Sequence, residues 1–89
     1  MLSLPPSVKI FLAPGATDMR KAIDGLVALT RAALSADPLS GHLFVFCNRR
    51  RDRLKILVWD RSGFWLLMKR LERGTFFWPS DESPVTLTW

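Results

Sequence analysis

The chain has 89 residues, 48% of them hydrophobic and 11% aromatic, which is enough apolar material for one small globular domain spanning residues 1–89. Apolar runs such as 64–68 fall far short of the roughly 20 residues of a membrane helix, and the amino-terminal residues lack the pattern of a signal peptide. The single cysteine excludes an internal disulfide framework and favours a reducing, cytoplasmic location, while the net charge of +5 favours a polyanionic partner.

The first predicted elements are a strand and a helix. Residues 8–12 are β-branched and aromatic and lie between proline-containing breakers, a pattern typical of a strand. Thr17 or Asp18 is the predicted N-cap of a helix, and apolar residues then recur at helical spacing as far as Leu34. Asp37-Pro38 should end this helix, because the residue before a proline is pushed out of the helical region.

After residue 42 the pattern changes to short apolar segments separated by turns. The predicted strands are residues 43–47, 54–59, 64–69 and 75–78, with a fifth expected at 85–89. Asp60-Arg61-Ser62-Gly63 is typical of a tight hairpin, and residues 48–52 form the loop of another. The predicted fold class is therefore α+β: an antiparallel sheet of four to five strands, in the order β-α-β-β-β, with one helix packed on one face.

Both faces of the predicted sheet carry apolar side chains, whereas one helix can cover one face. An antiparallel sheet usually exposes its second face to water, so a large aromatic surface there would mark a partner site. We therefore expect a homodimer or another protein partner on a surface formed by Phe44, Phe46, Trp59 and Trp65. The alternative is that the amino-terminal strand and the carboxyl-terminal tail fold over this face and cover it.

The sequence offers little that could catalyse a reaction. His42 begins a predicted strand and is better explained as a hydrogen-bonded boundary residue than as a general base, and Cys47 lies in an apolar run as a small buried residue. A structural zinc site needs four ligands, and the isolated glycines form no phosphate-binding loop. We therefore predict neither an enzyme nor a bound metal or cofactor.

Basic side chains are concentrated between residues 47 and 73, a stretch that contains nine lysines and arginines and only three carboxylates. The predicted nucleic-acid-binding residues are those of the loop and the strand that follows it, extended by the end of a neighbouring strand: Arg49, Arg50, Arg51, Arg53, Lys55, Lys69 and Arg70. Guanidinium groups projecting from a β-ribbon can contact DNA phosphates, which supply most non-specific affinity. The alternative is a solvated turn whose charge is balanced by Asp52 and Asp60.

Four stretches, in this order, also resemble one protein family. They are residues 17–21 with 24–26, residues 40–46, residues 48–55, and residues 69–74 with 77–79. Together they resemble the TnpB-type accessory proteins encoded by the second open reading frame of insertion sequence family sixty-six, a bacterial transposable element. The resemblance covers roughly residues 4–80 and is specific because the four stretches occur in order.

The resemblance implies a non-catalytic protein that assists a larger transposase, which itself carries the strand-cutting carboxylates. The resemblance does not define a mechanism, and the basic residues lead us to expect DNA binding through the hairpin; the alternative is an adaptor or dimerisation module that contacts the transposase without touching DNA. Members of the family usually continue into a leucine-rich helical tail, which this chain lacks. If that tail covers the second sheet face in relatives, its absence would expose the face here and would put activity in transposition in doubt.

Overall fold

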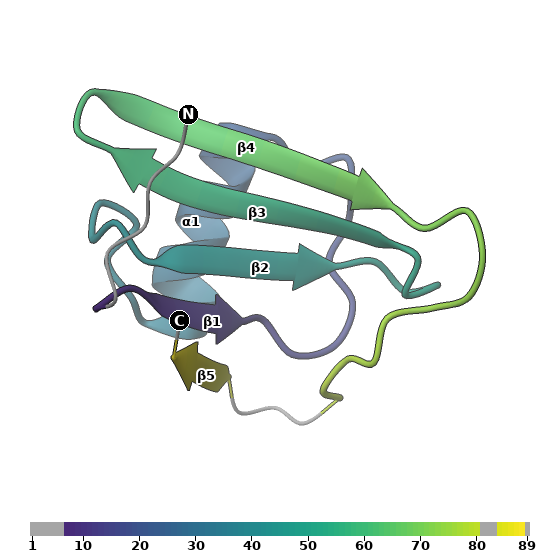
Figure 1. The fold of residues 1–89 in the computed structure, drawn as a ribbon. Helices are drawn as coiled ribbons and strands as arrows, with labels where there is room; N and C mark the ends of the chain where they lie inside the picture. Colours follow the sequence, from purple (N-terminus) through teal and green to yellow (C-terminus); the bar gives the residue numbers. More distant parts are fainter. Residues whose placement is uncertain (1–6, 81–83, 89) are drawn as a thin grey trace.

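The computed structural model describes residues 7–80 and 84–88 of the chain. Within these residues one helix packs on a five-stranded sheet, so the predicted α+β class is confirmed (Figure 1). In chain order the elements are β1 (Lys9–Leu12), α1 (Ile23–Leu34), β2 (Leu43–Cys47), β3 (Arg53–Asp60), β4 (Gly63–Arg70) and β5 (Val85–Thr88). The fifth strand was predicted to reach Trp89, which lies outside the described residues.

The sheet is mixed, and the prediction of a purely antiparallel sheet is wrong. Its strand order is β4-β3-β2-β1-β5, with β1 parallel to β2 and the other neighbouring pairs antiparallel. The connection from β1 to β2 contains the helix, and a crossover of this kind returns the chain to the same end of the sheet. β1 therefore lies between β2 and β5, with Ile10 beside Leu43 on one side and Leu87 on the other.

The helix begins later than predicted, at Ile23, and neither Thr17 nor Asp18 caps it. Ala22 occupies the N-cap position and makes no side-chain hydrogen bond there. The helix ends at Leu34, and the next residue, Ser35, adopts the left-handed conformation with φ 49°. None of the helical structure in the described residues is long and apolar enough to cross a membrane.

Both predicted hairpins are confirmed. Residues 48–52 join β2 to β3, and the turn between β3 and β4 is closed by the pair Asp60 and Gly63. Arg61, in that turn, has a φ of 53°, which is the backbone conformation that a two-residue hairpin turn demands.

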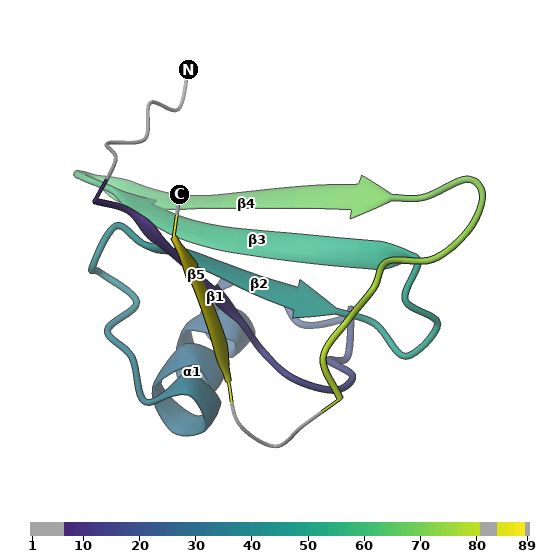
Figure 2. The same cartoon turned by 60° about the horizontal axis from the view of Figure 1, so that its bottom comes forward.

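Helix α1 covers one face of the sheet (Figure 2) and buries two of the four residues that were predicted to form a partner interface. Phe44 and Phe46 have 0% exposure and pack with Leu26 of the helix, so their assignment to an exposed interface is wrong. Trp59 pairs across the hairpin with Phe64, whose ring lies 5.0 Å away on the helix side. Alternation along strands then places Trp65 on the opposite face, so the four aromatic residues do not share one surface.

The second face of the sheet is covered in part by the segment that follows β4. Residues 75–78 were predicted as a strand, but they form an irregular connection that runs back across this face. Trp78 is buried against Val45 and Cys47, and its indole Nε1 donates a hydrogen bond of 2.8 Å to the carbonyl of Ala13. This cover stops short of the edge strand β4, where Trp65 is 46% exposed.

Candidate nucleic-acid interface

The loop between β2 and β3, residues 48–52, is called the arginine loop here and is held by the side chain of Asn48. The Asn48 Oδ1 accepts hydrogen bonds from the backbone N–H groups of Asp52 and Arg53 at 3.0 and 3.1 Å, and its Nδ2 donates to the Asp52 carboxylate at 2.7 Å. Arg51 takes the left-handed conformation, with φ 61°. A side chain thus satisfies backbone donors of the turn, as asparagine commonly does.

The arginine loop is also tied to the segment after β4. The N–H of Phe76 donates to the Arg51 carbonyl at 2.7 Å, and the N–H of Leu71 donates to the Asp52 carbonyl, also at 2.7 Å. These long-range hydrogen bonds connect the two segments that carry most of the basic residues at this end of the sheet. The loop is therefore a fixed part of the fold.

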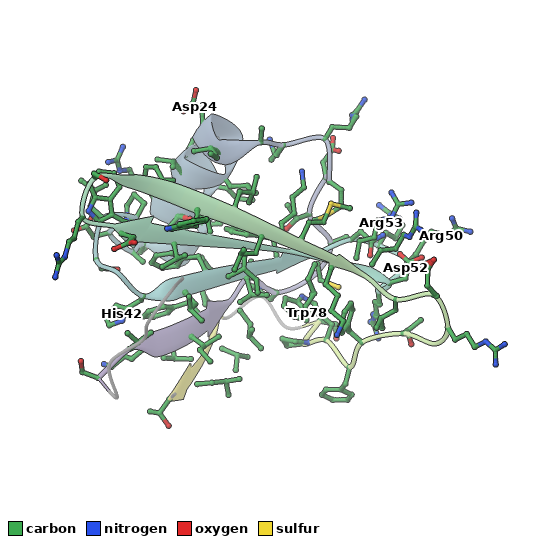
Figure 3. All side chains as sticks on the ribbon, turned by 45° about the horizontal axis from the view of Figure 1, so that its top comes forward. Asp24, His42, Arg50, Asp52, Arg53 and Trp78 are labelled. Carbon is green, nitrogen blue, oxygen red and sulfur yellow. The ribbon has the colours of Figure 1, made fainter. Side chains whose placement is uncertain are left out.

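The side chains of Arg49, Arg50 and Arg51 are exposed. In the part of the chain that the structure describes, the ion pairs join Arg20 to Asp18 and Arg70 to Glu72, and neither involves the arginine loop. The pKa of Asp52 lies below its ordinary value, mainly because of its hydrogen bond from Asn48 and then because of the charges of Arg50 and Arg53, while desolvation opposes the shift. The arginine loop therefore carries one ionised carboxylate and three exposed guanidinium groups. Figure 3 shows Asp52 close to Arg50 and Arg53.

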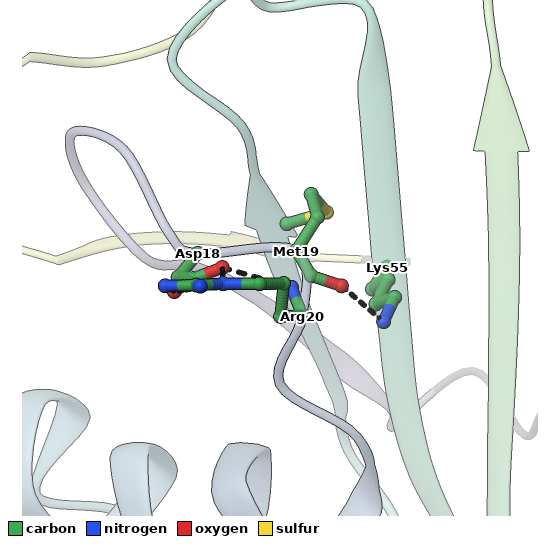
Figure 4. A network of polar contacts seen from close by, with 4 residues as sticks. All are labelled: Asp18, Met19, Arg20 and Lys55. Atoms are coloured by element: carbon green, nitrogen blue, oxygen red, sulfur yellow. Dashed lines mark hydrogen bonds and ion pairs between the residues drawn. The ribbon is translucent and has the colours of Figure 1, made fainter.

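Lys55 does not project with the arginines, contrary to the prediction. Its side chain lies on the helix face of β3, and the Nζ donates a hydrogen bond of 2.7 Å to the carbonyl of Met19 (Figure 4) and another of 2.7 Å to the carbonyl of Lys21. The ammonium group thereby fixes the connection between β1 and α1 to the sheet. Lys55 is a structural cation.

The other three predicted binding residues differ in their exposure and in their polar partners. Lys69 is exposed near the end of β4, opposite Leu54. Arg70 is exposed but paired with Glu72, with 2.9 Å between Nε and Oε2. Arg53 is half-buried, and its Nε is buried without a hydrogen-bond partner among the described residues.

The connection before α1 brings two further basic residues to this end, and sequence reasoning missed them. The N–H of Thr17 bonds to the Cys47 carbonyl at 2.7 Å, so Arg20 and Lys21 follow a segment anchored beside the arginine loop. The Arg20 guanidinium lowers the pKa of Asp18 to about 2, chiefly through side-chain hydrogen bonds. The sequence held no signal for this proximity, because it depends on the parallel pairing of β1 with β2.

A cavity of about 200 Å³ lies between the arginine loop and the segment after β4. Its lining residues are Gly15, Ala16, Asn48, Arg49, Arg51, Trp78 and Pro79. Gly15 has a φ of 72°, and its N–H donates to the Pro79 carbonyl at 3.0 Å, which closes one wall. No acidic side chain lines this cavity in the described structure, so it suits an anionic group.

Two other titratable side chains, His42 and Cys47, do not contribute to this surface. His42, at the opposite end of β2, accepts a hydrogen bond of 3.0 Å at Nδ1 from the N–H of Lys9. Cys47 is fully buried, and desolvation raises the pKa of its thiol. Within residues 7–80 and 84–88, no three His, Cys, Asp or Glu side chains gather in a set that could hold a metal ion. The chemistry that this end of the molecule offers is the binding of anions.

The sequence is similar to one protein family and to proteins of a bacterium. The profile of the family described as IS66 Orf2 like protein matches residues 8–89. Two relatives come from Sinorhizobium fredii. Uncharacterized protein y4jC is 43% identical over 79 residues, which cover 89% of this chain and 68% of the relative. Uncharacterized protein y4hO is 42% identical over 95 residues, which cover 100% of this chain and 83% of the relative. No solved structure matches.

Proposed function

The chain belongs to the IS66 Orf2-like family, and from this membership we propose that it is an accessory protein of insertion-sequence transposition. From the exposed arginines of the arginine loop we propose further that it binds DNA. It acts beside a separate transposase, which performs the strand cutting. The contacts are made mainly to phosphates, because nothing in the arginine loop selects a base.

The proposal of DNA binding rests on the exposure and the unpaired charge of the three loop arginines. They are exposed, they have no carboxylate partner among the described residues, and their backbone is fixed by Asn48 and Phe76. A loop that only needed to turn would gain from pairing such charges or from replacing them. Fixed, unpaired guanidinium groups instead offer ready contacts to a phosphate backbone.

Chemical-shift mapping with a short duplex tests the proposal. The amide resonances of residues 48–53 and 69–73 should shift on titration with DNA, whereas those around His42 and Arg61, at the other end of the strands, should stay in place. Shifts spread evenly over the protein, or confined to β4, would contradict binding through the arginine loop.

A second candidate function is suggested by the edge strand β4. It is eight residues long, and Trp65, Leu67 and Met68 on it are 46%, 41% and 56% exposed. An open strand edge with exposed apolar side chains can pair with another chain, either the transposase or a second copy of this protein. Sedimentation across a concentration series and capture by the transposase, with Leu67→Lys as the variant, would detect such an adaptor role.

A further inference from the structure

Phe77 is the most exposed apolar side chain of the described structure, at 97% exposure. It lies between two aromatic neighbours that are both packed, since Trp78 is buried and Phe76 contacts the same cluster on the second sheet face. Exposing a whole phenylalanine ring to water forgoes the stabilisation that burying it would give. The ring therefore contributes nothing to the core, and its position needs another explanation.

The backbone on either side of Phe77 is fixed. The N–H of Phe76 donates to the Arg51 carbonyl at 2.7 Å, and the Trp78 indole donates to the Ala13 carbonyl at 2.8 Å. Pro79 adds a third anchor by accepting the hydrogen bond of Gly15. The ring thus projects from a support that is attached on both sides and loses little backbone entropy when it meets a partner.

Two arginines lie beside the residues that follow Phe77. Arg49 and Arg51 line the cavity of about 200 Å³ whose other wall is formed by Trp78 and Pro79, the residues that follow Phe77. The remaining exposed large apolar side chains lie elsewhere, at Leu39, on β4 and on β5, so Phe77 stands apart from any apolar patch in the described residues. An isolated ring next in sequence to a cavity lined by two arginines suits a nucleotide, which has both a π face and a phosphate, better than an apolar protein surface.

Building on the proposed function, we propose that Phe77 stacks on an unpaired nucleobase while Arg49 and Arg51 hold a neighbouring phosphate at the cavity. Inserting the ring into an intact duplex would require a base step to unstack, and an unpaired base does not impose that cost. The Asn48 Oδ1 already accepts hydrogen bonds from Asp52 and Arg53, and its Nδ2 donates to Asp52, so Asn48 lacks the free acceptor that a bidentate contact to a base edge needs. The site therefore recognises an unpaired base without selecting its identity.

The test compares two fluorescently labelled DNAs of the same sequence, one fully paired and one with a single bulged base. Wild-type protein should bind the bulged DNA more tightly. Phe77→Ala should weaken binding to the bulged DNA by roughly 5- to 150-fold, which corresponds to about 1–3 kcal/mol of stacking per base, and should change binding to the paired DNA little. Phe77→Trp should retain the preference, and Phe77→Leu, which keeps an apolar side chain without a π face, should lose it.

Leu39→Ala is the matched control, because it removes an exposed apolar side chain that precedes β2, at the end away from the arginine loop. All variants should keep the wild-type melting temperature, since neither side chain is buried. Equal affinity of wild type and Phe77→Ala for the bulged DNA, or a preference retained by Phe77→Leu, would overturn the stacking inference and leave phosphate binding by the arginine loop intact. A variant that binds both DNAs normally but loses the transposase would show that Phe77 contacts protein. Failure of the wild-type protein to bind either DNA would overturn the proposed function as well.

Discussion

Removing the three loop charges is the sharpest test of DNA binding through the arginine loop. The variant combines Arg49→Ala, Arg50→Ala and Arg51→Asn. Asparagine is chosen at the third position because the backbone there has φ 61°, and asparagine tolerates the left-handed conformation better than alanine does. The three side chains are exposed and make no hydrogen bonds among the described residues, so the fold should persist.

The expected effect follows from counterion release. Each phosphate contact contributes about −0.9 to the slope of log K against log salt concentration, so loss of three contacts should make the slope shallower by roughly 2.7. Between about 50 and 200 mM salt, that difference corresponds to roughly 40-fold in the ratio of affinities. The measurement is fluorescence anisotropy with an unrelated duplex at several salt concentrations.

A control variant removes the same number of charges from the opposite end of the sheet. Lys9→Ala, Arg31→Ala and Arg61→Asn also lower the net charge from +5 to +2, and Arg61 again has a positive φ of 53°. Lys9 begins β1, Arg31 lies in the last turn of α1, and Arg61 lies in the β3–β4 turn, all away from the arginine loop. This control should keep nearly the wild-type slope. If both variants flatten the slope equally, overall charge rather than the arginine loop attracts DNA, and the reasoning is refuted.

Three further predictions concern the internal contacts. Lys55→Met should lower the free energy of unfolding by about 2–3 kcal/mol, because two charge-assisted hydrogen bonds are lost. Thermal unfolding should show this as a decrease of roughly 10–20 °C in Tm. The salt dependence of DNA binding should stay unchanged, and a changed slope would show that Lys55 belongs to the binding surface. Arg20→Ala should raise the pKa of Asp18 from about 2 towards 3.8 in an NMR titration. Because folding depresses this pKa, the stabilisation by Asp18 is present above pH 3.8 and lost as the pH falls towards 2, and denaturant unfolding of Arg20→Ala should lack that loss. Cys47 should react with a thiol reagent only on unfolding, because burial both raises the pKa of the thiol and blocks access to it; fast reaction of the native protein would contradict this.

Local sequence signals predicted the hairpins well. The Asp60–Gly63 turn and the arginine loop were both expected from turn residues between apolar segments, and both occur where they were placed. Turn chemistry acts over a few residues, so a single sequence can reveal it. The burial of Cys47 was likewise readable from its apolar neighbours.

The errors arose where long-range packing decides the outcome. The aromatic residues 75–78 have strand-like composition, yet the hydrogen bond of Trp78 to Ala13 and the packing of Phe76 hold them as an irregular cover. Phe44 and Phe46 alternate as predicted, but periodicity alone does not reveal which face the helix covers. Lys55 looked like one more charge in a basic run, and its carbonyl partners are 34 and 36 residues away in sequence.

The arginine loop combines features that are individually unfavourable for stability. Arg51 sits in the left-handed conformation, which costs a non-glycine residue roughly 1–2 kcal/mol, and its guanidinium lies near two others with no internal carboxylate partner in the described structure. The chain nevertheless holds this geometry, because Asn48 Oδ1 accepts hydrogen bonds from two backbone N–H groups of the hairpin, and the N–H groups of Phe76 and Leu71 donate to carbonyls of the loop. Strain and charge repulsion persist when surrounding contacts over-determine them, and they concentrate where binding takes place. An external anion would relieve the repulsion among the loop arginines without requiring the loop to move. Anion binding would therefore gain free energy from charges that the isolated protein leaves unpaired.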